Sequence, residues 1–232
     1  MSAALRWLPQ GTVYGALLNF RREWDLWAPQ MTEAPYKAAP QAPVLYIKTA
    51  NTFAPCGAAI AVPDEVDVGA TLGLVIGGFE EKLPPALAES AQAATKKEAG
   101  GLHRIAGCVL LNDLSLPHAS YYRPPIKFRN RDGFLGCGPV LQAVPDLSTL
   151  ALELRINGTL AQRIELSTLV RDAATLLRDV SEFTTLQAGD VLMLGTDCLP
   201  DGTRPRAKAG DRIEISAPGF APLVNTLVED AA

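Results

Sequence analysis

Basic residues gather in one stretch of this mildly acidic chain, LNDLSLPHASYYRPPIKFRNRDGF, residues 111–134. The stretch places a lysine and three arginines between two aspartates, whereas the whole chain has a formal net charge of −4. These residues are Asp113, Arg123, Lys127, Arg129, Arg131 and Asp132. Because a guanidinium group binds a carboxylate through two parallel hydrogen bonds, the pattern suits a ligand with more than one negative charge. A solvated loop is the alternative, and the prolines of the stretch disfavour a helix.

Further polar residues stand at the expected ends of apolar strands. Lys48 lies near the end of VLYIKTA, Asp113 follows AGCVLLN, and Thr196 follows VLMLG. We expect Lys48, Asp113, Lys127 and Thr196 to line one pocket although they are far apart in sequence. Two of them have simpler interpretations: Lys48 as a side chain that extends its charge to solvent at a sheet edge, and Asp113 as the first residue of an Asx turn.

Other common kinds of catalytic site find little support. No serine lies in a G-x-S-x-G turn, no glycine-rich phosphate loop is found, and neither His103 nor His118 has a partner that its spacing predicts. We interpret both histidines as structural or surface residues. The four cysteines form no CxxC pair, which disfavours a zinc site and favours free thiols in a reducing compartment.

The elements that position these residues are mainly strands. Apolar runs predict strands at 12–20, 44–50, 70–78 and 103–115, and the run at 70–78 is apolar enough to be covered on both faces. In LELRINGTLAQRIEL, Asn157 and Gly158 lie between two alternating runs and predict a two-residue hairpin turn. Gly-Asp pairs predict turns before two later strands, in LQAGDVLMLGT and AKAGDRIEISAPGF.

Two helices are expected beside the strands. Residues 84–101 are rich in alanine, open with proline and close with two glycines. Residues 167–183 are amphipathic, and Ser167 is the expected N-cap. No repeat, linker or low-complexity tract divides the chain, so we expect one domain over residues 1–232, with an N-terminal arm over about residues 1–43.

Composition disfavours several classes of partner. No run of about eighteen apolar residues is present, so no membrane-spanning helix is expected. The first residues lack the charged-then-apolar order of a secretory signal, and we expect a cytoplasmic protein. The acidic net charge and dispersed basic residues disfavour nucleic acid as a partner.

Several motifs taken together resemble the fumarylacetoacetate hydrolase family. They are NDLS, RDGF followed by GP, LQAGDVLMLGT, and GDRIEISAPGF followed by PLVN. The resemblance covers roughly residues 13–228 and implies an α+β, mostly β fold: a single-domain mixed β-roll with a few flanking helices. PYKAAPQAPVLYIKTANTF, GATLGLVIG and SYYRPPIKFRNRDGF resemble one branch, the N-terminal half of the bifunctional decarboxylase/isomerases of 4-hydroxyphenylacetate (homoprotocatechuate) breakdown.

The resemblance also bears on metal binding. The family usually holds a divalent metal with two glutamates of an E-x-E and the aspartate of NDxS. Asp113 matches that aspartate, but Gly69 and Thr71 stand at the E-x-E positions, and Glu23 stands where the family has a histidine. A single carboxylate holds a hard cation weakly. We therefore expect no cofactor, or at most a weakly held Mg²⁺ on Asp113.

The activity that the resemblance implies is isomerisation of 2-hydroxyhepta-2,4-diene-1,7-dioate to 2-oxohept-3-ene-1,7-dioate in aromatic catabolism. Lys48 and Thr196 are the expected residues at the carbonyl or enolate end, with Asp113 or Glu23 as the base. Arg123 and Lys127 are expected to hold the far carboxylate. The complete expected set of substrate-binding residues is Arg123, Lys127, Arg129 and Asp132.

The resemblance leaves the division of labour open. Decarboxylation of 5-oxopent-3-ene-1,2,5-tricarboxylate suits a metal-bearing homologous subunit, so we expect a homodimer or a hetero-oligomer with such a subunit. One alternative is a non-catalytic structural partner of that subunit, which the missing E-x-E favours and the retained Lys48 and Asp113 disfavour. Another is a hydrolase of C–C bonds in acylpyruvate-like diketones, which the incomplete metal site disfavours.

Overall fold

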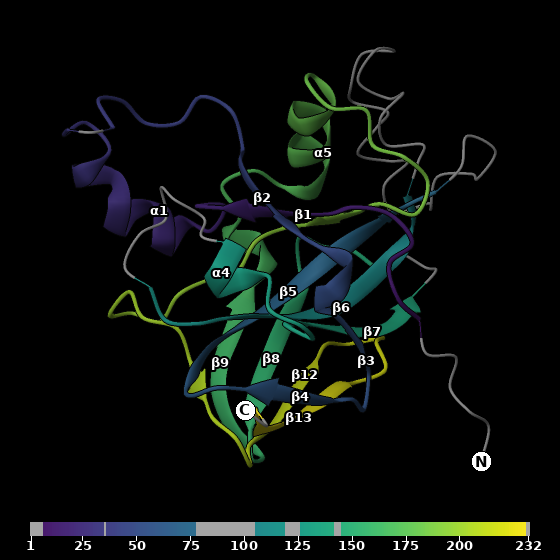
Figure 1. The fold of residues 1–232 in the computed structure, drawn as a ribbon. Coiled ribbons are helices and arrows are strands. Elements are labelled where there is room, and N and C mark those ends of the chain that lie inside the picture. The colour runs from purple at the N-terminus through teal and green to yellow at the C-terminus, as the bar shows by residue number, and fades with distance from the viewer. Residues whose placement is uncertain (1–6, 35, 78–104, 119–125, 142–144, 231–232) are drawn as a thin grey trace.

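The fold is built mainly from strands, as Figure 1 shows for the computed structural model of the chain. The structure describes residues 7–34, 36–77, 105–118, 126–141 and 145–230. Two sheets contain all the described strands, and short helices lie around them. The expectation of a mostly β, mixed roll is confirmed.

The larger sheet has eight strands in the order β2–β1–β10–β5–β6–β7–β3, with β11 paired to β5. Most neighbours are antiparallel, but β1 pairs with β10 and β3 pairs with β7 in parallel, so the sheet is mixed. Its strands are β1 (Val13–Leu17), β2 (Val44–Lys48), β3 (Phe53–Pro55), β5 (Val66–Ile76), β6 (Ile105–Ser115), β7 (Leu135–Leu141), β10 (Val191–Met193) and β11 (Arg206–Ala207).

The smaller sheet has five strands in the order β4–β13–β12–β8–β9. The main core lies between the two sheets, where Leu72 and Leu110 of the larger sheet belong to one buried cluster with Leu152 and Ile215 of the smaller. The strands of the smaller sheet are β4 (Ala59–Val62), β8 (Ala151–Ile156), β9 (Thr159–Glu165), β12 (Arg212–Ser216) and β13 (Leu223–Glu229).

The larger sheet is buried on its second face as well. Val109 and Leu111, which alternate with Leu110 along β6, form a separate buried cluster with Val13 and Val191. Neighbouring residues of a strand point to opposite faces, so β6 contributes to both cores. All but one residue of β5 are buried too. The expectation that residues 70–78 form a strand covered on both faces is therefore confirmed for the described part of that run.

Two expectations about helices need correction. The amphipathic helix α5 begins at Ala173, and its N-cap is Asp172, whose side chain accepts a hydrogen bond from the Thr175 N–H. Ser167 is not the cap because Leu169 pairs with Phe20 in a β-bridge, which keeps the backbone out of the helix at that point. The helices of the described residues are α1 (Arg21–Trp27), α4 (Ile126–Arg129), α5 (Ala173–Ser181) and the 3₁₀ turns η1 (Ala28–Gln30), η2 (Ala50–Thr52) and η3 (Leu166–Thr168).

The second correction concerns the basic stretch. Its prolines disfavour a helix, yet a single turn, α4, forms directly after them. This is compatible with proline, which is tolerated before or at the start of a helix because the first N–H groups have no partner within the helix. The expected helix at 84–101 lies outside the described residues.

The turns follow the sequence expectations. Asn157 and Gly158 both have positive φ, 52° and 80°, as a type I′ hairpin between β8 and β9 requires. The two Gly-Asp turns precede β10 and β12, with φ of 91° at Gly189 and 92° at Gly210. The described residues of the expected arm, 7–34 and 36–43, contribute β1 to the larger sheet and α1 beside it. No helix of the described part of the chain is long and apolar enough to cross a membrane.

Candidate active site

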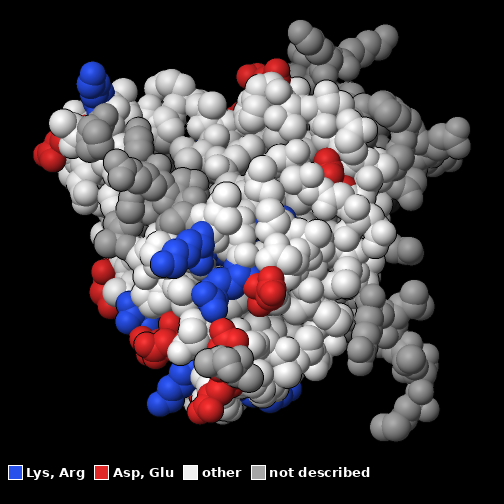
Figure 2. Space-filling model, in the orientation of Figure 1, with Lys and Arg blue, Asp and Glu red and all other residues white. Residues whose placement is uncertain are grey.

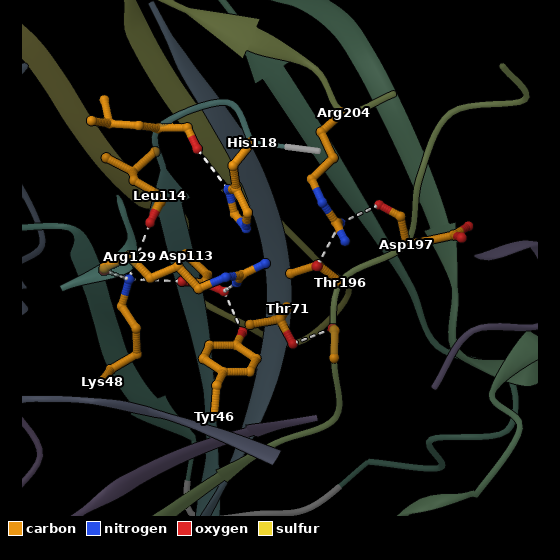
Figure 3. A network of polar contacts seen from close by, with 12 residues as sticks. Tyr46, Lys48, Thr71, Asp113, Leu114, His118, Arg129, Thr196, Asp197 and Arg204 are labelled. Atoms are coloured by element: carbon orange, nitrogen blue, oxygen red, sulfur yellow. Dashed lines mark hydrogen bonds and ion pairs between the residues drawn. The ribbon is translucent and has the colours of Figure 1, made fainter. Parts of the chain in front are cut away.

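Two buried polar clusters lie near the end of β6 (Figure 3). We call the first the Asp113 cluster, and it consists of Tyr46, Lys48, Asp113 and Arg129. We call the second the Arg204 cluster, and it consists of Glu23, Thr196 and Arg204. Each cluster joins residues from distant parts of the sequence, so only the folded sheet brings them together.

In the Asp113 cluster, two cations and a phenol surround one carboxylate. Lys48 Nζ lies 2.9 Å from Asp113 Oδ1, and Arg129 Nη1 lies 3.4 Å from Oδ2, to which the Tyr46 hydroxyl also donates. Lys48 Nζ donates further to the carbonyl oxygens of Leu114, at 3.1 Å, and Arg129, at 2.5 Å. An ammonium group has three N–H donors, and three oxygens surround it here. The geometry therefore fits a charged Lys48.

Strand geometry positions Tyr46 and Lys48. They are two residues apart on β2, so both side chains point to the same face of the sheet. The Tyr46 ring lies over Gly15 of β1, where an added Cβ would be 2.2 Å from a ring carbon. Only glycine leaves room for the ring. The guanidinium carbon of Arg129 lies 4.5 Å from the centre of the same ring, which stacks it against Tyr46.

Burial and charge act in opposite directions on this cluster. Burial raises the pKa of Asp113, but Lys48, Arg129 and the Tyr46 hydrogen bond outweigh it, so the pKa is lowered. Burial, followed by the Asp113 charge, raises the pKa of Tyr46 well above its usual value. Burial lowers the pKa of Lys48, and the Asp113 carboxylate opposes that change. With two cations and one carboxylate, the cluster has one net positive charge.

The Arg204 cluster connects the N-terminal and C-terminal parts of the fold. Arg204 Nη2 lies 2.7 Å from Glu23 Oε1, and Nη1 donates to Thr196 Oγ1 at 2.5 Å and to the Asp197 carbonyl at 3.0 Å. The other Glu23 oxygen accepts the Leu18 N–H at 3.1 Å. The Glu23 carboxylate is therefore paired and hydrogen-bonded through both oxygens.

A pocket of about 470 Å³ reaches both clusters. Arg129 of the first cluster and Arg204 of the second line it, together with Arg206, His118 and Asp67. Arg206 lies at the exposed side, paired with Glu65 at 3.0 Å and Asp67 at 3.2 Å. Three arginines and a histidine around one hollow suit an anionic ligand.

Arg129 has hydrogen-bonding capacity that the protein does not use. Its Nε is buried and has no hydrogen-bond partner among the described residues, and Nη1 contacts Asp113 only at 3.4 Å. A buried N–H without a partner costs about 1–3 kcal/mol. Arg129 also lines the pocket, so a ligand carboxylate there would meet its positive charge.

The fold and these motifs agree with a family model, fumarylacetoacetate hydrolase C-terminal, which matches residues 12–228. The chain belongs to the fumarylacetoacetate hydrolase family. Its curated relatives include two Escherichia coli proteins. They are a 4-hydroxyphenylacetate degradation bifunctional isomerase/decarboxylase, 38% identical, and a homoprotocatechuate catabolism bifunctional isomerase/decarboxylase, 37% identical. Each match covers 95% of this chain and 48% of the relative, so the chain spans about half the length of these proteins.

Solved structures show the same fold. The 5-carboxymethyl-2-hydroxymuconate delta-isomerase of Mycobacterium smegmatis is 26% identical, with a TM-score of 0.67 over 94% of this chain and 77% of that one. The 2-hydroxyhepta-2,4-diene-1,7-dioate isomerase of Mycobacterium marinum has a TM-score of 0.63 over 95% of this chain and 75% of that one. At 21% identity, the second likeness supports the fold alone.

The residues present do not fit the divalent metal that the family usually binds. Gly69 lies opposite Asp113 on β5, and a Cβ there would be 2.6 Å from Thr196 Cγ2, so the threonine methyl occupies the space of a side chain. The Thr71 hydroxyl donates to the Gly195 carbonyl at 2.5 Å. Lys48, Arg129 and Tyr46 already surround the Asp113 carboxylate. Within the described residues, no group of three or more His, Cys, Asp or Glu side chains could hold a metal ion.

The structure brings some of the expected family residues together and separates others. Lys48, Asp113 and Arg129 form one cluster, while Thr196 and Glu23 belong to the other. Their roles in the reaction stay predictions. The pocket is lined by Arg129 and Arg204, and their partners Asp113 and Thr196 are almost fully buried.

The remaining expected residues lie elsewhere. Lys127 is exposed on α4, and Asp132 is exposed and accepts a hydrogen bond from Asn51 Nδ2 at 2.7 Å. Figure 2, which has the orientation of Figure 1, shows lysine and arginine side chains gathered near the middle of the face it draws, with acidic side chains beside them. The described lining of the pocket contains none of the four residues expected to share it, which are Lys48, Asp113, Lys127 and Thr196. The expectation that these four side chains line one pocket is therefore wrong for this pocket, which the partners Arg129 and Arg204 line instead. Arg123 lies outside the described residues.

Sequence reasoning misses three residues of the site. Tyr46 has a usable signal, since it lies two positions before Lys48 on the same strand and so shares its face. The sequence indicates a structural or surface role for His118, but this residue lines the pocket. Arg204 has no local signal, because its partner Glu23 is 181 positions away in sequence.

Proposed function

We propose that this chain isomerises 2-hydroxyhepta-2,4-diene-1,7-dioate to 2-oxohept-3-ene-1,7-dioate, as one part of a bifunctional isomerase/decarboxylase system. The proposal is supported by the names of the curated relatives and of a structural neighbour at 26% identity. The observation that carries it is the pocket, which is lined by Arg129 and by two further arginines, Arg204 and Arg206. Such a pocket suits a small diacid.

The electrostatics of the Asp113 cluster suit the chemistry. Ketonisation of a dienol removes the hydroxyl proton, so negative charge develops on that oxygen and spreads through the diene. The net positive charge of the cluster, presented to the pocket through Arg129, stabilises that charge. Lys48 does not line the pocket; it is fully buried and contributes its charge through the ion pair that holds Asp113 in place. No reacting step in this scheme depends on a divalent cation.

We assign the decarboxylation of 5-oxopent-3-ene-1,2,5-tricarboxylate to a homologous partner subunit with a complete set of metal-binding carboxylates. This chain covers 48% of its curated relatives, which are named as bifunctional. The electron pair released by loss of CO₂ needs strong charge stabilisation, which a chelated divalent metal provides. Gly69 and Thr71 cannot supply such carboxylates.

The test is turnover by the purified chain alone. We expect it to consume the dienol diacid at the same rate before and after treatment with a chelator. The reaction is measured by the loss of dienol absorbance. Loss of turnover on chelation would contradict the assignment of charge stabilisation to side chains. No turnover with the chain alone, and turnover only with a metal-bearing homologue, would support the non-catalytic partner instead.

A further inference from the structure

His118 is held at the pocket by two contacts that fix its orientation. Its Nδ1 lies 2.9 Å from the Leu116 carbonyl oxygen, and its ring stacks on Phe128, with centroids 5.6 Å apart and an interplanar angle of 18°. A carbonyl oxygen only accepts hydrogen bonds, so Nδ1 holds a proton. In the neutral ring the lone pair is then on Nε2, which points toward the Arg129 side chain in the view of Figure 3, and both residues line the pocket.

The two carboxylates first expected as the base are poorly suited to that role. Asp113 contacts Lys48 and Arg129, and its pKa is lowered, so it accepts a proton weakly. Glu23 is 2.7 Å from Arg204 and accepts the Leu18 N–H with its other oxygen. Both carboxylates are therefore occupied by contacts within the protein.

Asp67 is the competing group, because it lines the same pocket and burial raises its pKa. However, Asp67 Oδ1 lies 3.2 Å from Arg206 Nε, and that ion pair opposes the effect of burial. The Nδ1 contact of His118, in contrast, leaves Nε2 directed into the site. The orientation therefore favours His118 over Asp67 as the group that exchanges a proton with a ligand.

We propose that His118 is the general base of the isomerisation, an inference that rests on the proposed function. Nε2 takes the proton of the 2-hydroxyl group, and the electron pair of the broken O–H bond forms the C2=O bond. The π electrons shift so that C3=C4 replaces C2=C3 and C4=C5, and C5 takes up a proton from water while the imidazolium returns its own to water. Atoms and charge balance, and no oxidant or reductant is needed. Arg129, which lines the same pocket as His118, stabilises the oxygen as it loses its proton.

The test compares His118→Ala with His103→Ala, which removes the only other histidine of the chain. We expect His118→Ala to lower kcat by about 100-fold or more, the usual contribution of a general base, and His103→Ala to leave it unchanged. Binding of heptanedioate, a saturated diacid that cannot react, should persist in His118→Ala, which shows that the pocket is intact. Added imidazole should restore turnover to His118→Ala, because it replaces the missing proton acceptor, and should not restore turnover to Arg129→Gln. If His118 were only structural, added imidazole would not restore turnover to His118→Ala.

Two further arms separate the inference from the proposed function. If the unmodified chain turns over the dienol and His118→Ala retains that rate, or if Asp67→Asn removes it while His118→Ala does not, His118 is not the base and the proposed function stands. If the unmodified chain has no turnover, both fail together.

Diethyl pyrocarbonate, which acylates accessible imidazole nitrogens, gives a readout without turnover. Heptanedioate should protect His118 from modification and leave the modification of His103 unchanged. Absence of protection would show that His118 does not meet a ligand in the pocket.

Discussion

Lys48 and Asp113 form an ion pair that is closed to solvent: Nζ and Oδ1 are 2.9 Å apart, and the two side chains are 0% and 1% exposed. Removing two charges from water is costly, and the attraction between them compensates only when the remaining donors and acceptors are also satisfied. Here Lys48 has two backbone carbonyls besides Asp113, and Asp113 has Tyr46 and Arg129 besides Lys48. The pair therefore fixes the position of the Asp113 carboxylate, which in turn contacts Arg129.

Breaking this pair should destabilise the fold strongly. Lys48→Met keeps the length of the side chain but leaves the Asp113 carboxylate and two carbonyl oxygens without the ammonium. Loss of one partner of a buried pair costs about 3–5 kcal/mol. Urea unfolding should show a loss of that size, whereas Lys127→Met, an exposed lysine on α4, should stay within about 0.5 kcal/mol. Equal stabilities for the two variants would contradict the buried position of Lys48.

The lowered pKa of Asp113 makes part of the stability depend on pH in the acid range. Its folded pKa lies below the unfolded value of about 3.9, so the unfolded state binds the proton more tightly. The contribution is therefore complete above the unfolded pKa and is lost as pH falls through the folded pKa. The free energy of unfolding should decline less steeply below about pH 4 in Asp113→Asn than in the unmodified chain. Parallel declines would show that Asp113 does not titrate in this way.

The strands are predictable because their signals are local. The apolar runs of β5 and β6 and the Asn157-Gly158 turn depend on neighbouring residues alone, and the structure confirms them. The NDLS motif is local as well, and it suffices to single out Asp113. The cap of α5 is mispredicted because the Leu169–Phe20 bridge, which keeps Ser167 out of the helix, joins distant segments.

The arrangement of cations does not follow from the sequence. In an extended backbone, Lys127 and Arg129 would point to the same side, because side chains two residues apart share a face. In the single turn of α4, residues two apart point in different directions, so Arg129 is buried on Asp113 while Lys127 is exposed. The pairing of Arg204 with Glu23 is a tertiary contact with no sequence pattern behind it.

The Gly69 position should reject a side chain because of one methyl group. An added Cβ would lie 2.6 Å from Thr196 Cγ2, so Gly69→Ala should destabilise the fold by about 1–3 kcal/mol. Thr196→Ser removes that methyl and keeps the hydroxyl that accepts from Arg204. Gly69→Ala should therefore cost less in the Thr196→Ser background, with a coupling of about 0.5 kcal/mol or more in a double-mutant cycle of urea unfolding. Additive effects would mean that the backbone around Asp113, not the Thr196 methyl, excludes the side chain.

Arg129 should decide the affinity for diacids. A charge-assisted hydrogen bond to a carboxylate in a buried setting is worth about 1.5–3 kcal/mol, or roughly ten- to a hundredfold in binding. Arg129→Gln should therefore weaken the binding of heptanedioate by about that factor in calorimetry, because the positive charge of the guanidinium group is lost from the pocket. Lys127→Gln, in the same helical turn but exposed, is the matched control and should bind heptanedioate as the unmodified chain does.

Thermal unfolding of Arg129→Gln shows whether the variant is still folded, since Arg129 also contacts Asp113. If a folded Arg129→Gln binds the diacid normally while Lys127→Gln does not, the anion site lies on the outer face of α4, and the pocket assignment is wrong.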